Sequence, residues 1–179
     1  MAWTTPITWT TGAVLTAAQL NQQLRDNMNE TAPAKFTAAS QIFVSTGANA
    51  GSPRTVVWDY VGSAQTTTSS SFVDLATVGP TVTATTGVQA LVCISARLQH
   101  GTANANSYMG YAVSGATTIA AVATSSVAST ASAGGSWEQQ SYVLMQGSLT
   151  AGSNTFQAKY QTNTGTATFD SRRLTVLPF

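Results

Sequence analysis

The sequence predicts a mainly β protein, an antiparallel jelly-roll-like β-sandwich preceded by a short N-terminal helix. From residue 71 onward, about seven or eight short runs rich in β-branched and aromatic residues follow one another, separated by turn residues. No helical repeat lies between these runs, and strands of such length and spacing are typical of sandwiches and jelly rolls. One well-marked helix start, near residue 16, stands apart from them.

The helix is predicted from a capping box between Thr16 and Gln19, in which each side chain bonds the backbone N–H of the other residue. Pro33 is expected to end the helix, which gives a length of about 14 residues, marginal for an isolated helix in water. Its narrow apolar stripe consists of Ala17, Leu20, Leu24 and Met28. Such a helix needs a partner that covers the stripe.

Three parts are expected along the chain: an N-terminal leader and helix at 1–35, a β connector at 36–70 and a sandwich head at 71–179. The runs 41–46 and 54–62 predict the strands of the connector. The polar stretch 63–71 carries no large apolar side chain and is the expected boundary before the head.

Within the head, the strand at 88–99 is the most distinctive. Its continuous apolar centre, "ALVCI", predicts a strand that is covered on both sides. The low-complexity segment 116–136 predicts a strand followed by a long mobile loop. The other strands are expected at 71–78, 81–85, 107–115, 137–149, 154–162 and 166–179.

The charge content excludes several classes of partner. Only 7% of the residues are charged, against roughly 25% in average soluble chains, and the net charge is +1. Nucleic acid and anionic membranes therefore find no basic surface, and no apolar stretch is long enough for a membrane span. Without an export signal at the N-terminus, the chain is expected to be made in a cytoplasm. Low charge also favours association with other copies or with a larger assembly.

Residues suited to catalysis are few, so we expect no enzyme, no metal site and no cofactor. His100 is the single histidine and is expected on an exposed loop, and Cys93 is expected as a small buried hydrophobe. The six carboxylates are scattered singly, and no nucleophile elbow or phosphate-binding loop is present. A glycan-degrading enzyme, which needs two carboxylates across a cleft, stays as an alternative of another class.

Aromatic and apolar side chains indicate binding surfaces instead. The leader has no core of its own, so its apolar residues are the expected assembly contact: Trp3, Trp9, Leu15, Leu20, Leu24 and Met28. Trp58 is expected as a half-buried strand residue. A second, weaker set comprises residues expected to face a ligand, namely His100, Tyr108 and Trp137.

Two segments resemble those of tailed-bacteriophage virion surface proteins. The first is "WTTGAVLTAAQLNQQLRDNM", residues 9–28, which is similar to the amino-terminal segment of many such proteins. The second runs from "SSSFVDLATVGP" to "RRLTVLPF" and resembles the β-sandwich heads of phage fibres and minor tail proteins, especially of phages that infect actinobacteria.

The resemblance implies a homotrimer with jelly-roll heads, attached by its N-terminal segment to the virion. Its partners would be further copies of itself and the major capsid protein or a tail protein, with a host surface glycan as a further ligand. Two locations on the virion are open. The short chain favours a capsid decoration or head-fibre protein, and the alternative is a short tail fibre or minor tail protein that binds the host surface. No catalytic residues follow from the resemblance.

Overall fold

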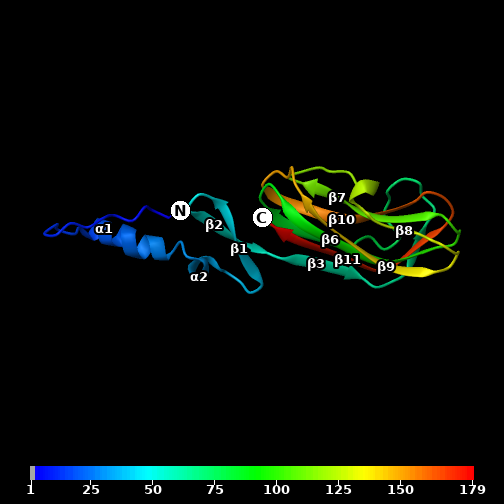
Figure 1. Cartoon of the computed structure of the whole chain (residues 1–179), viewed down its shortest axis with the longest axis horizontal. Coiled ribbons are helices and arrows are strands. Elements are labelled where there is room, and N and C mark those ends of the chain that lie inside the picture. The colour runs from blue at the N-terminus through cyan, green and yellow to red at the C-terminus, as the bar shows by residue number, and fades with distance from the viewer. Residues whose placement is uncertain (1–2) are drawn as a thin grey trace. The chain divides into compact units, whose positions relative to one another are not determined.

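The computed structural model describes residues 3–179 and shows a mainly β chain, with 49% of residues in strands and 11% in helices (Figure 1). The predicted antiparallel sheets and short N-terminal helix are confirmed. The chain divides into two compact units, the first ending at Thr55 and the second running from Val56 to Pro178. The residues predicted as a connector are shared between these units.

The helix of the first unit begins as the sequence predicts. Thr16 caps α1 (Ala17–Leu20), and both bonds of the capping box with Gln19 are present. The helix continues through a π-helical segment, η1 (Asn21–Asp26), in which backbone bonds span five residues. It ends before Pro33, which lies in the first turn of a separate short helix, α2 (Ala32–Lys35). The first helix thus ends just before the segment 30–35, as expected, but Pro33 itself is helical, because proline is tolerated where the first N–H groups have no helical partner.

A two-stranded sheet completes the first unit. It pairs β1 (Gln41–Gly47) with β2 (Ala50–Thr55) in antiparallel register, and Phe43 on β1 meets Phe36 edge to face at 6.3 Å between ring centroids. The run 54–62, predicted as one strand, is divided: β2 ends at Thr55, and β3 (Val57–Val61) joins a sheet of the second unit.

The second unit consists of two antiparallel sheets that face one another. One has the order β5-β10-β7-β8, and the other has the order β3-β11-β6-β9 with β4 also paired to β11. Their bounds are β4 (Gln65–Thr67), β5 (Thr81–Thr86), β6 (Ala90–His100), β7 (Asn106–Gly115), β8 (Val127–Thr130), β9 (Trp137–Gln146), β10 (Gly152–Thr162) and β11 (Ala167–Pro178), with a 3-10 turn, η2 (Ala123–Ser125), before β8.

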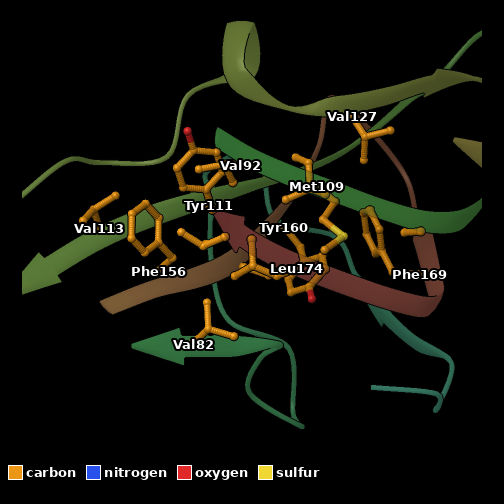
Figure 2. Close-up of a cluster of buried hydrophobic side chains, with 14 of the residues drawn as sticks. Val82, Val92, Met109, Tyr111, Val113, Val127, Phe156, Tyr160, Phe169 and Leu174 are labelled. Atoms are coloured by element: carbon orange, nitrogen blue, oxygen red, sulfur yellow. The ribbon is translucent and has the colours of Figure 1, made fainter. Parts of the chain in front are cut away.

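The core lies between these two sheets. Alternate residues of each strand point inward, so that β10 contributes Phe156 and Tyr160 while β11 contributes Phe169 and Leu174, all fully buried (Figure 2). The Tyr160 and Phe169 rings, from opposite sheets, lie 5.0 Å apart between centroids. This inward alternation is what a two-layer sandwich requires, because each strand then buries one face.

Two segments of the head differ from the sequence expectation. Residues 71–78, predicted as a strand, pair with β10 only through Val73 and Tyr160, because Leu75 turns into the core instead of continuing the ladder. In 116–136 the order is reversed: an irregular stretch with η2 comes first, and the strand β8 follows it.

Arg172 is a fully buried cation at the centre of the second unit. Its guanidinium donates to the carbonyl oxygens of Ser63 at 3.2 Å and Gly79 at 3.4 Å, and its Cζ lies 5.3 Å from the centre of the Tyr160 ring. The Tyr160 hydroxyl donates to the same Gly79 carbonyl at 2.6 Å. These bonds tie both ends of the segment 63–80, which contains β4, to the core.

Burial of Tyr160 makes stability sensitive to alkaline pH, because it raises the pKa of the phenol to about 12. Between its unfolded pKa of about 10 and this value, only the unfolded chain releases the proton. The free energy of unfolding should therefore fall by up to about 3 kcal/mol between pH 10 and 12. Urea unfolding at pH 8 and pH 11 measures this free energy, and its fall should be smaller for Tyr160→Phe than for the unchanged chain. Equal falls in the two proteins would show that Tyr160 does not cause the alkaline loss of stability.

Candidate functional site: an uncovered sheet face and an apolar leader

Strand β6 explains how an apolar surface arises on the second unit. Its even-numbered residues, such as Val92 and Ile94, are fully buried in the core, whereas Leu91 and Cys93 point away from it and are only half-buried. The sequence expectation that this strand is covered on both sides is therefore met on one side only. Cys93 is a residue of the outer face and not of the core.

The strand register brings further apolar residues beside these two. Cys93 lies opposite Val143 on β9, and Leu91 lies opposite Met145 on β9 and Leu177 on β11. Trp58 on β3 belongs to the same outer face, since its partner Thr175 lies opposite Cys93. We call this set the outer-face patch: Trp58, Leu91, Cys93, Val143, Met145 and Leu177.

The outer-face patch is well exposed in the single chain. Trp58 is 68% exposed, Val143 54% and Met145 51%. The expectation that Trp58 is half-buried is wrong, because this side of the sheet carries no covering layer from its own unit. Strongly exposed apolar side chains gathered on one sheet face are typical of interaction surfaces.

Cations on aromatic rings lie on the same outer face as the patch, Arg173 beside it and Arg97 farther along β6. The Arg173 guanidinium lies 4.5 Å from the centre of the Tyr60 ring, and that of Arg97 lies 4.9 Å from the Trp137 ring. Arg97 also pairs with Asp170 at 3.3 Å. An apolar centre with a polar, arginine-rich border is the usual anatomy of a protein interface.

The leader of the first unit leaves a second apolar surface open. The six residues expected to make the assembly contact are all exposed: Trp3 39%, Trp9 43%, Leu15 45%, Leu20 40%, Leu24 58% and Met28 65%. Their role in assembly stays a prediction, but the single chain leaves each of them accessible.

Two polar residues hold the leader against the helix. Asn27, only 3% exposed, accepts the Thr4 N–H at 2.9 Å through Oδ1 and donates to the Thr4 carbonyl at 3.2 Å. Gln23 accepts the Ile7 N–H at 3.0 Å. Neither residue was expected from the sequence to make this contact, although their four-residue spacing is the signal that could have identified them. Polar groups make this contact, and the leucine and methionine side chains of the apolar stripe stay exposed.

The residues expected to face a ligand do not converge. His100 is buried at the end of β6, where Nδ1 accepts the Thr102 N–H at 2.9 Å and Nε2 lies 2.7 Å from the Thr164 carbonyl. The expectation of an exposed loop histidine is wrong, because two loops, which contain Thr102 and Thr164, enclose the ring and bond to it. Trp137 lies on the outer face of its sheet beneath Arg97, while Tyr108 on β7 points outward from the other sheet, opposite Gln161.

The carboxylates of the chain are engaged in separate local contacts. Lys35 lies 2.9 Å from Glu30, and the hydrogen bond between them holds the pKa of that carboxyl below its usual range. The other pairs are Asp26 with Arg25, Asp59 with the Thr81 N–H, Asp74 with Lys159, Glu138 with Ser129, and Asp170 with Arg97. Within residues 3–179 no three His, Cys, Asp or Glu side chains gather as a metal site would need.

Neither the protein families nor the curated proteins compared with this chain contain a match to it. Among the helices of the described part of the chain, none has the length and apolarity needed to cross a bilayer.

Proposed function

We propose that the chain is a non-enzymatic structural protein of a tailed-bacteriophage virion, a homotrimeric surface appendage attached through its N-terminal segment and decorating the capsid. One observation carries the proposal: each of the two units leaves open an apolar surface that its own residues do not cover. Exposed apolar area on this scale is stabilised when another surface covers it. Two separate surfaces fit two separate contacts, one among copies and one with the particle.

The head supports self-association through the outer-face patch. β6 carries the apolar pattern of a strand covered on both sides, and a second copy would supply the cover that one chain lacks. With a formal net charge of +1, the copies repel one another little. The patch contains no carboxylate or ammonium group, so its burial would leave no charge unpaired.

We also propose that the sandwich is a jelly roll. Sequence neighbours β5 and β6, β6 and β7, β8 and β9, β9 and β10, and β10 and β11 lie in different sheets. Among the strands of the second unit, only β7 and β8 are both consecutive and paired. Repeated crossing between two antiparallel sheets is the connectivity expected of that architecture.

The capsid is proposed first because the two units follow one another directly. β2 ends at Thr55 and β3 begins at Val57, so the sequence between the two units is too short to form the shaft of a long fibre. The alternative, a short tail fibre, is favoured by a different observation, a polar groove on the head that is described below.

Labelling of assembled particles tests both proposals. We expect an antibody against the chain to label purified particles over the shell, with on the order of hundreds of copies by quantitative mass spectrometry. A count of only a few or tens, with label at the tail, would show instead that the protein is a short tail fibre. Absence of the chain from purified particles would overturn the virion proposal itself.

A further inference from the structure

The four-stranded sheet carries an open groove on the face that points away from the core. The groove has a volume of about 520 Å³, within the range of small-molecule sites. Ala112 on β7 and Lys159 and Gln161 on β10 form its floor, and these strands are direct neighbours in the sheet (Figure 1). Residues 70–72 form one wall, and Ala120 and Ala121 form the other.

Small residues in the sheet allow the walls to approach the floor. Gly110 lies beside Lys159 in the register, and a Cβ at Gly110 would come within 2.5 Å of Ser126 Oγ and 3.2 Å of the Phe72 ring. The Phe72 ring is therefore held close above the strands. It gives the groove one apolar aromatic surface beside a polar floor.

The single cation of the groove is already neutralised. Lys159 Nζ contacts both oxygens of Asp74, at 2.8 and 2.9 Å, and Gln157 donates to the same carboxylate at 3.2 Å. Gln161 Nε2 donates to the Ser70 carbonyl at 2.7 Å. These bonds fix the two floor side chains in position before any ligand arrives.

The groove residues can still form hydrogen bonds with a ligand. The ammonium of Lys159 has three donors, the amide oxygen of Gln161 is an acceptor, and the hydroxyls of Ser70 and Ser71 can do both. A saccharide matches this set, because each of its hydroxyls donates and accepts while its C–H face is apolar. A free phosphate or nucleotide matches it poorly, since Asp74 cancels the charge of Lys159.

We propose that this groove binds a neutral carbohydrate. Gln161 and the serine hydroxyls bond the sugar hydroxyls, Lys159 donates to one of them, and Phe72 packs against the apolar face of the sugar ring. Tyr108 extends the same surface, since it lies opposite Gln161 on the outward side of the sheet. The site is a binding site without a hydrolytic role.

Binding to an array of immobilised neutral and anionic oligosaccharides tests the proposal with the purified full chain. We expect at least one neutral oligosaccharide to bind. In calorimetric titration with that sugar, Gln161→Leu should weaken binding by about tenfold, and Ala112→Trp, which fills the floor, should abolish it. The matched control is Gln89→Leu, an exposed turn residue outside the groove, which should bind as the original chain does.

Three results would overturn the proposal. They are no binding to any neutral member of the array, preference for anionic members, and binding that all three variants retain. Thermal unfolding of each variant shows whether it is folded, so that loss of binding is not confused with loss of structure. Because the assay uses the isolated chain, its outcome is independent of whether the chain belongs to a virion.

Discussion

Replacing Val143 and Met145 with glutamate should convert a trimer into folded monomers. Both side chains are more than half exposed on β9 and lie opposite Cys93 and Leu91 in the outer-face patch. A single chain tolerates carboxylates there, because they stay in water. In a trimer that buries the patch, each unpaired carboxylate would cost several kcal/mol per copy, more than such an interface can offset.

Light scattering measures this outcome directly. The original chain should have three times the mass of the 18.5 kDa monomer, and the double variant should have one. The matched control is Thr83→Glu with Thr85→Glu, a pair with the same two-residue spacing on the exposed side of β5. That control should stay trimeric.

The reactivity of Cys93 gives a second measurement of the equilibrium between monomer and trimer. It is the single thiol of the chain, and it lies half-buried at the centre of the patch. Alkylation by iodoacetamide should be slow in the trimer and faster in the double glutamate variant. A monomeric original chain, or a double variant that stays trimeric with an unchanged alkylation rate, would show that the outer-face patch is not the interface.

Replacing Leu20 and Leu24 with aspartate should abolish attachment to the particle while the sandwich stays folded. The two leucines are 40% and 58% exposed, so their loss removes little from the fold of the first unit. Asn27 and Gln23 hold the leader through hydrogen bonds to its backbone, and these changes replace neither of the two side chains. Two carboxylates on an apolar contact are expected to reduce binding by at least about 100-fold.

Reconstitution with particles that lack the protein measures attachment. The matched control is Asn21→Asp with Gln22→Asp, which adds the same charge to exposed polar positions of the same helix. This control should attach, and the thermal midpoint of the head should be equal in all three proteins. Full attachment of the leucine variant would show that the helix is not the anchor.

Local sequence signals predicted the parts of the fold that depend on neighbouring residues. The capping box at Thr16 formed as expected, because its bonds join residues only three apart. Likewise, a strand was expected at 154–162, and in β10 Phe156, Ala158 and Tyr160 alternate with exposed or half-buried residues, as a strand with one buried face requires. Tyr108 and Tyr111, three apart on one strand, point to opposite sides as that period requires.

Errors arose where a distant contact decided the outcome. The run 54–62 reads as one strand, yet its two halves pair with different partners, β1 and β11. His100 lies in a polar sequence that suggested an exposed loop, but Thr162 and Thr164, more than 60 positions away, enclose its ring. The alternation of a strand carries no information about which segment pairs with it.

The residues alone indicate the class of the protein: a charge-poor, strand-rich chain with one capped helix whose apolar stripe is too narrow to stabilise it without a partner. They also mark β6 as a strand suited to cover on both sides. That one of those sides stays open, with Trp58, Val143 and Met145 beside it, depends on the pairing of distant strands. Hydrophobic burial depends on apolar area whatever residues supply it. An apolar pattern therefore indicates that a surface will be covered, but not which segment or partner covers it.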